Sequence, residues 1–204
     1  INNAALKSTK AYLGGIVGMS EGTVTDCTNE AEAVIDGLEH TGGIAGASKG
    51  RIDKCQNMSV INGSVKYVGG IAGEGNVSNS QNEGVITGKE DANYIAGITG
   101  NGVASWCVNK GDISGVNYIG GIAGAGTVIN SYNAADIKAA GGSAGGIAGQ
   151  SVSVSFCYNT GNVHTVTDYA GGIAGAGPVS DCFNYGNITT DSTGQYFGKL
   201  TGIG

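Results

Sequence analysis

The segment Gly-Gly-Ile-Ala-Gly at residues 42–46 is the most informative part of this chain about its fold, because it recurs along the sequence at a nearly fixed interval. Its copies, some of them with substitutions, begin at residues 14, 42, 69, 96, 120, 145, 171 and 198. Successive starts are therefore 28, 27, 27, 24, 25, 26 and 27 residues apart. A fixed period of this size indicates stacked supersecondary units rather than a fold with one central core.

Composition indicates a β-rich chain and excludes several other classes. Glycine supplies 40 of the 204 residues and proline only one. The absence of a three-residue period excludes collagen, and the lack of proline argues against a proline-rich linker. Hydrophobic residues make up 40% of the chain, and Ile and Val recur in register, so disorder is not expected.

The distribution of charged residues disfavours some classes of binding partner. The formal net charge is −6, and the ten Lys and Arg residues are dispersed. We therefore expect no nucleic-acid partner, since phosphate binding needs clustered basic residues. No apolar stretch approaches the roughly 20 residues of a membrane-spanning helix, and no signal peptide is visible. The chain begins with Ile1 and ends inside an eighth repeat, so we expect it to be a slice of a longer, processed polypeptide.

Seven complete units align column by column. The isoleucine of the glycine-rich segment forms the clearest column, at Ile16, Ile44, Ile71, Ile98, Ile122, Ile147 and Ile173. An apolar column follows, at Val24, Ile52, Val77, Ala104, Val128, Val154 and Val179. Next comes Cys or Ser, at Cys27, Cys55, Ser80, Cys107, Ser131, Cys157 and Cys182. Two residues later stands an invariable asparagine, at Asn29, Asn57, Asn82, Asn109, Asn133, Asn159 and Asn184. A last apolar column contains Ile61, Ile86, Ile113, Ile137, Val163 and Ile188, and the first unit is irregular there.

These columns predict an all-β fold, a parallel β-solenoid. Three short apolar stretches per unit of about 26 residues, separated by Gly and Asn turns, are typical of a coil with three short strands. Each wall is expected to pair in parallel with the same wall of the next coil, about 4.8 Å away. We expect about seven coils in one domain over residues 1–204, wound as a right-handed β-helix like other parallel crossovers.

Strand alternation assigns faces to the glycine-rich wall. If Ile71 points inward, then Gly69 and Gly73 do so too, whereas Gly70 and Ala72 face outward. This parity predicts a smooth outer wall of Gly and Ala, suited to close lateral contact with a partner. A tyrosine column precedes the wall, at Tyr12, Tyr67, Tyr94, Tyr118, Tyr169 and Tyr196, with His40 and Ser143 as substitutes. These rings either pack inward over glycine or lie at a corner with the hydroxyl in water.

The cysteine and asparagine columns are interpreted as structural ladders. In-register parallel strands point their Cβ atoms the same way, which is poor disulfide geometry, so we expect free, buried thiols. Asparagine tolerates left-handed backbone, and its amide can donate to its own copy in one neighbouring coil and accept from the other. An asparagine in all seven units is too regular for an active site, which would occur once.

Other motifs carry no catalytic prediction. The glycine clusters lack the helix and the Gly-Lys-Ser/Thr ending of a phosphate-binding loop. No zinc spacing, Ser-His-Asp set or isolated carboxylate pair is apparent, and neither a catalytic residue nor a cofactor is expected. The densest acidic stretch, Glu30, Glu32, Asp36 and Glu39, is expected to be a solvated loop, with a calcium contact as the alternative.

Trp106 and Phe156 are the candidate ligand contacts. They precede Cys in a column otherwise filled by Asp26, Lys54, Asn79, Asn130 and Asp181, so they are expected to point outward. Isolated exposed aromatics are common and need no function. A second aromatic run, Tyr132, Tyr158 and Phe183, lies just beyond the Cys/Ser column.

The repeated unit resembles the GLUG motif, for example in YIGGIAGAGTVINSYNAADI at 118–137 and YAGGIAGAGPVSDCFNYGNI at 169–188. The resemblance covers essentially the whole chain. It implies a β-helical repeat region of a large secreted or wall-attached bacterial protein, and hence an extracellular location. GLUG repeats also flank the catalytic region of zinc metallopeptidases that cleave immunoglobulin A1. The His-Glu-x-x-His signature of those enzymes is absent from this chain, so no zinc chemistry carries over.

The leading hypothesis is a non-catalytic scaffold, an adhesive or spacer segment that binds a host protein or glycan. Two open rod ends would also favour end-to-end self-association, unless residues 1–11 fold over as a cap. One alternative is a glycan-binding or glycan-cleaving β-helix, which requires a groove with non-repeating acids and aromatics. Another is the accessory, substrate-positioning region of an immunoglobulin A1-type peptidase.

Overall fold

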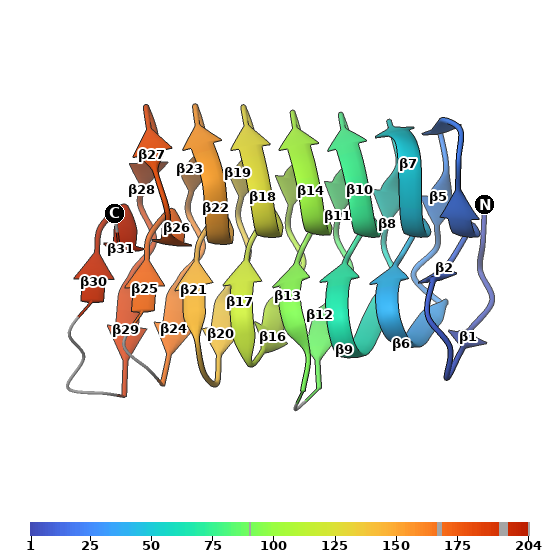
Figure 1. Cartoon of the computed structure of the whole chain (residues 1–204), viewed down its shortest axis with the longest axis horizontal. Coiled ribbons are helices and arrows are strands. Elements are labelled where there is room, and N and C mark those ends of the chain that lie inside the picture. The colour runs from blue at the N-terminus through green and yellow to red at the C-terminus, as the bar shows by residue number, and fades with distance from the viewer. Residues whose placement is uncertain (90, 167–168, 192–195, 204) are drawn as a thin grey trace.

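The chain forms an extended stack of β-coils, seen in the computed structural model in Figure 1. The structure describes residues 1–89, 91–166, 169–191 and 196–203. Within these residues there are strands, turns and bends but no helix, and every strand pairing is parallel. The predicted fold class, an all-β parallel solenoid of about seven coils, is confirmed.

Three sheets run along the stack. The 7-stranded sheet consists of β5 (Thr28–Asn29), β8 (Gln56–Asn57), β11 (Gln81–Asn82), β15 (Val108–Asn109), β19 (Tyr132–Asn133), β23 (Tyr158–Asn159) and β28 (Phe183–Asn184). The 10-stranded sheet consists of β3 (Val17–Ser20), β4 (Val24–Thr25), β7 (Ala45–Asp53), β10 (Ala72–Ser78), β14 (Thr99–Ser105), β18 (Ala123–Ile129), β22 (Ala148–Ser155), β26 (Ala174–Ala176), β27 (Val179–Ser180) and β31 (Thr201–Ile203).

The 14-stranded sheet is the largest. It consists of β1 (Leu6–Lys7), β2 (Leu13–Gly14), β6 (Val34–Gly42), β9 (Val60–Gly69), β12 (Ile86–Gly88), β13 (Asn93–Ala96), β16 (Ile113–Gly115), β17 (Asn117–Gly120), β20 (Ile137–Ala139), β21 (Ser143–Gly145), β24 (Val163–Thr165), β25 (Tyr169–Gly171), β29 (Ile188–Thr190) and β30 (Tyr196–Gly198). The long strand β9 pairs with both β12 and β13, so two short strands replace one long strand from that coil onward.

Two apolar cores run the length of the stack. One contains the isoleucines of the glycine-rich segments together with the following apolar and Cys columns. The other contains the last apolar column and the residues before the glycine pair, such as Ile61 and Val68. The isoleucine column is fully buried from Ile44 to Ile173, whereas Ile16, in the first coil, is 36% exposed. Each coil therefore contributes residues to both cores, and these residues pack against their counterparts in the next coil.

The asparagine column forms a continuous hydrogen-bonded ladder. Each Nδ2 donates to the Oδ1 of the next asparagine over 2.7–2.9 Å, from Asn29 through to Asn184. Asn109 shows the full pattern: its Nδ2 also donates to the carbonyl of Gly111, whose N–H donates back to Oδ1. All four polar positions of this buried amide are thereby satisfied, which removes the cost of burying it.

The predicted outer wall of Gly and Ala is wrong. Ala45, Ala72, Ala123, Ala148 and Ala174 are fully buried in the first core. The reason is a bend: β9 ends at Gly69 and β10 begins at Ala72, so two-residue alternation does not run through the segment. The chain passes there from one core to the other. A Cβ on Gly70 would lie 2.4 Å from Cγ of Asn82 and 2.1 Å from the carbonyl oxygen of Gly97.

The first unit is also more regular than its sequence suggested. The predicted loop around Asp36 and Glu39 lies on strand β6, where Ile35 pairs with Ile61 and fills the last apolar column. Residues 1–11 extend the stack and do not fold over its end, because Leu6 pairs with Ile35 and Asn2 donates to Asn29. The first unit differs from the others only in the spacing of its residues. The nine-residue strand β6 accommodates this difference by a shift in its pairing register between Gly37 and Glu39.

The asparagine ladder predicts a large effect of Asn109→Ala. The change would leave the Asn82 donor and the Asn133 acceptor unpaired in the interior, so we expect a loss of about 3 kcal/mol in the free energy of unfolding. Urea denaturation measures this loss. The exposed Asn187→Ala is the control and should change stability little. Equal stability of the two variants would contradict the role of the ladder.

Candidate functional site

A left-handed corner precedes the Cys/Ser column in every coil. Its backbone φ is close to +50° at Asp26, Lys54, Asn79, Trp106, Asn130, Phe156 and Asp181. The left-handed conformation was expected at the asparagine ladder, but it lies here, three residues earlier. Asn and Asp tolerate this conformation, whereas a bulky side chain pays roughly 1–2 kcal/mol for it. Two aromatics in this column therefore call for an explanation.

Trp106 and Phe156 point outward, as predicted. Their side chains are 63% and 60% exposed. Neither has an aromatic partner among the residues that the structure describes. These two rings thus occupy a strained backbone position without gaining burial or stacking in return. Strained positions of this kind concentrate at ligand sites.

Two open hollows adjoin Trp106, and together they are called the Trp106 groove. The first has a volume of about 470 Å³ and is lined by Arg51, Asn76, Val77, Ser78, Asn79, Val103, Ser105 and Trp106. The second has a volume of about 340 Å³ and is lined by Trp106, Cys107, Val108, Asn130, Ser131, Tyr132, Phe156 and Tyr158. Trp106 lines both, so the groove runs along the stack across several coils.

Three residues that line the first hollow, Arg51, Ser78 and Asn79, form a polar cluster with Asp53 that occurs once in the described chain. Arg51 Nη2 lies 2.6 Å from Asp53 Oδ1, and Arg51 Nε donates to Ser78 Oγ over 2.8 Å. Asn79 Nδ2 and Ser78 Oγ both donate to Asp53 Oδ1. Hydrogen bonds from Arg51 and Asn79 lower the pKa of Asp53 to about 2. The cluster is therefore an ionised pair at neutral pH, with no net charge.

The second hollow is aromatic and amide-lined. Tyr132 and Tyr158 stack with ring centroids 4.2 Å apart, and Tyr132 Oη hydrogen-bonds Thr160 Oγ1 over 2.9 Å. The side-chain amide of Asn130, between Trp106 and Phe156 in the corner column, has no hydrogen-bond partner among the described residues. This hollow can accept a ligand with both an apolar face and hydroxyl groups.

The tyrosine column lies at a second left-handed corner and not inside the stack. Tyr12, His40, Tyr67, Tyr94 and Tyr118 have φ between 47° and 64°, and their rings follow one another with centroids 4.6–5.4 Å apart. Tyr94 and Tyr118 are stacked and the other neighbouring rings are tilted, and Lys66 Nζ lies 4.4 Å from the centroid of the Tyr67 ring. The column thus stabilises the corner through contacts between successive rings. The side chain of Tyr196 lies outside the described residues.

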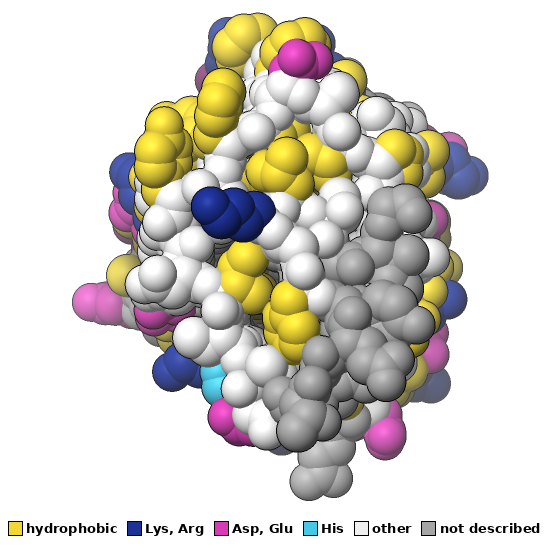
Figure 2. Space-filling view, turned by 90° about the vertical axis from the view of Figure 1, so that its left-hand side faces the viewer, with side chains coloured by type: hydrophobic (Ala, Val, Ile, Leu, Met, Phe, Trp, Pro, Cys, Tyr) yellow, Lys and Arg dark blue, Asp and Glu magenta, His cyan; other side chains and the backbone are white. Residues whose placement is uncertain are grey.

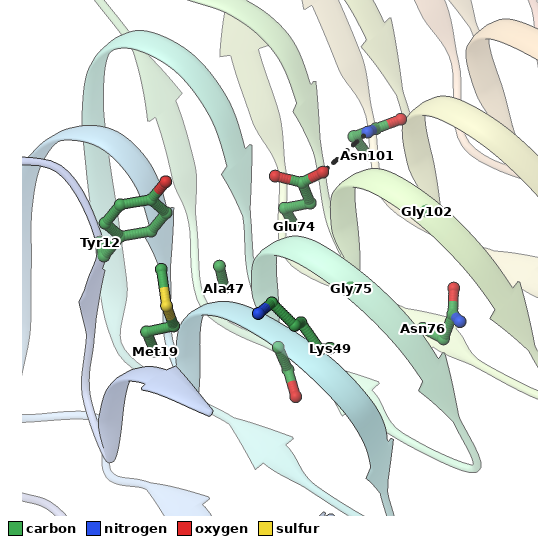
Figure 3. Close-up of a pocket in the computed structure, with 10 residues that line it drawn as sticks. Tyr12, Met19, Ala47, Lys49, Glu74, Gly75, Asn76, Asn101 and Gly102 are labelled. Atoms are coloured by element: carbon green, nitrogen blue, oxygen red, sulfur yellow. Dashed lines mark hydrogen bonds between the residues drawn. The ribbon is translucent and has the colours of Figure 1, made fainter. Parts of the chain in front are cut away.

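A third hollow lies beside Tyr12, with a volume of about 470 Å³. Figure 3 shows Glu74 beside Asn101, which donates to it over 3.4 Å, and Met19 close to Tyr12. His40 Nε2 also lies 3.0 Å from Glu74. Among the described residues that line this hollow, Glu74 is the only acid. Glycoside hydrolysis uses a pair of carboxyl groups, so this site lacks the requirement for that chemistry.

The described residues contain no group of three or more His, Cys, Asp and Glu side chains that could hold a metal ion. His164 lies apart from His40, on β24, beside Thr189 and Asp191. The described residues contain no helix that is long and apolar enough to cross a membrane. The arrangement around Trp106 is the candidate site, because it brings exposed rings and polar side chains together along two hollows.

The cysteines are free, and four of the five are buried. Cys27 is half-buried. Burial raises the pKa of the Cys55 and Cys107 thiols to about 11. Cys107 borders the second hollow but its side chain is only 1% exposed. The column is a packing ladder, in which Ser80 and Ser131 replace cysteine.

Comparison with known proteins returned no family model, no curated protein and no solved structure that matches this chain.

The strain at Trp106 predicts that Trp106→Asn raises the free energy of unfolding by about 1 kcal/mol, because Asn suits the left-handed corner. Its neighbours Asn79 and Asn130 already have this conformation. Urea denaturation measures the change. Trp106→Ala keeps the strain and should give no gain. A marked loss of stability in Trp106→Asn would show that the ring serves packing instead.

The thiol pKa values predict a pH dependence. An unfolded thiol ionises near its ordinary value of 9.0, whereas buried Cys55 and Cys107 keep their protons to about pH 11. Stability is therefore full below pH 9 and is lost as the pH rises toward 11. Denaturation curves between pH 8 and about pH 11 test this, with Cys55→Ser/Cys107→Ser as the control that should show a weaker decline. Iodoacetamide at neutral pH should label Cys27 before either buried thiol.

Proposed function

We propose that this chain is a non-catalytic repeat scaffold, an adhesive or spacer segment of a bacterial cell-surface or secreted protein. The supporting observation is the unbroken asparagine ladder, which links Asn29 to Asn184 through the interior of the stack. A rod in which every coil is bonded to the next in three sheets resists bending. The extracellular placement rests on the resemblance of the repeats to the GLUG motif.

The ends of the rod support a further part of this proposal, end-to-end association. Figure 2 looks onto the end at which the C-terminus lies, and hydrophobic side chains reach that surface. Phe197 and Leu200 there are 39% and 40% exposed. Strands β28, β29 and β31 are edge strands at this end, with pairing groups available to another chain. Lateral self-association through the predicted outer wall of Gly and Ala is not proposed, because the alanines of that segment are buried.

A spacer must be rigid, so a measurement of the rigidity of the rod tests this proposal. Spin labels at Lys54→Cys and Asp181→Cys, both at exposed corners, are five coils apart, or about 24 Å along the rod at about 4.8 Å per coil. The five native cysteines are replaced by serine, which Ser80 and Ser131 show to be accepted in this column. Double electron–electron resonance should give one narrow distance distribution.

The same pair measured in denaturant provides the broad reference distribution. A native distribution nearly as broad as that reference would contradict the spacer. A narrow distribution at a much shorter distance would contradict the stacked geometry.

A further inference from the structure

We propose that the Trp106 groove binds an extended, neutral glycan chain lengthwise along the rod. This inference rests on the scaffold proposed above and names the ligand that its adhesive surface would take. Three features carry it: the spacing of the exposed rings, the amides between them, and the charge of the lining.

The spacing of the rings suits a repeating polymer. Trp106 and Phe156 occupy the same corner two coils apart, which places them about 9.6 Å from each other along the rod at about 4.8 Å per coil. This separation is comparable with the length of one disaccharide in an extended chain. A pyranose has an apolar C–H face that stacks on an aromatic ring, so both rings can hold sugars of the same chain.

The amides supply the polar contacts. Asn130 lies between the two rings, and its side-chain amide has no hydrogen-bond partner within the part of the chain that the structure describes; Asn79 lies on the other side of Trp106. Asn79 donates one N–H to Asp53, which fixes its orientation and leaves its carbonyl oxygen for a ligand. Sugar hydroxyls can both donate to and accept from such amides. Aromatic rings and amides thus alternate along the corner at the coil spacing.

The charge of the lining selects a neutral ligand. Among the described residues that line the groove, Arg51 is the only one with a charged side chain, and Asp53 neutralises it at 2.6 Å. A single-stranded nucleic acid would need a basic groove beside its stacking rings. The net charge of −6 also repels anionic polysaccharides over the whole chain.

The left-handed corner explains why both rings are presented so fully. A side chain at φ near +55° projects away from the sheet. The carbonyl of the residue before it accepts a hydrogen bond from the preceding coil, as Ser105 does from the N–H of Asn79, and the N–H of Trp106 donates to the carbonyl of Ile129 in the next coil. The corner is therefore held rigidly on both sides of each ring. A rigid, pre-formed platform loses little entropy when a ligand binds.

Trp106 is the only tryptophan of the chain, so its fluorescence reports on this groove alone. The probes are cellohexaose, xylohexaose, mannohexaose and chitohexaose, titrated separately into the intact chain. At least one should shift or quench the Trp106 emission saturably and give a matching isotherm by calorimetry. No change with any of the four probes, up to millimolar concentration, would overturn the proposal.

Site variants locate the binding. Trp106→Asn and Phe156→Asn install the residue that Asn130 already carries at this corner, so both variants should fold, as circular dichroism can verify. Each should weaken calorimetric binding about tenfold, the size of one lost stacking contact. Lys54→Asn, in the same column but outside the groove lining, is the matched control and should bind normally. Binding unchanged in both ring variants would overturn the assignment of the site.

The outcomes separate this inference from the scaffold on which it rests. Absent glycan binding with a narrow spin-label distance removes the glycan and leaves the spacer. A broad spin-label distance with intact binding would remove the rigid spacer and leave the groove. Binding of heparin in preference to all four neutral probes would contradict the charge argument and with it the proposal.

Discussion

The contact between a buried asparagine amide and a bare glycine underlies the whole structure. In coil after coil the second glycine of the glycine-rich segment faces the asparagine of the same coil, and a Cβ at Gly121 would lie 2.4 Å from Cγ of Asn133. The amide can lie there only if all its polar atoms are paired, and the next coils supply those pairs. The ladder therefore couples the coils in register, because a slip by one residue would unpair every amide.

This coupling divides the molecule into an invariant interior and variable corners. The cores and the ladder admit few substitutions, since each position packs against its own copy above and below. The corner before the Cys/Ser column keeps its left-handed backbone but accepts Asp, Lys, Asn, Trp and Phe. The residues of this corner, together with outward-facing strand residues such as Arg51, line the Trp106 groove. At the tyrosine corner the rings contact one another, whereas Trp106 and Phe156 leave theirs in solvent.

Predictions from the sequence succeeded for residues that recur at the same position of every repeat. The isoleucine and asparagine columns recur at fixed positions, and only an interior ladder explains an unvarying polar residue. The prediction for Ala72 failed because alternation assumes a continuous strand, and the bend at Gly70 breaks that assumption. The predictions also placed the left-handed residue at the asparagine. The backbone conformation of Lys54 or Trp106 follows from the coil closing on itself, and no propensity of those residues indicates it.

The repeat, the parallel stacking and the buried columns can be predicted from the sequence, because periodic burial leaves a periodic pattern of residues. The sequence also identified Trp106 and Phe156 as exceptions in a polar column. The burial of the glycine-rich segment and the position of the Arg51–Asp53 cluster beside Trp106 are seen only in the three-dimensional structure. Both features depend on where the chain bends and on which side chains of different coils come together. The residues of a single repeat do not reveal such contacts between coils.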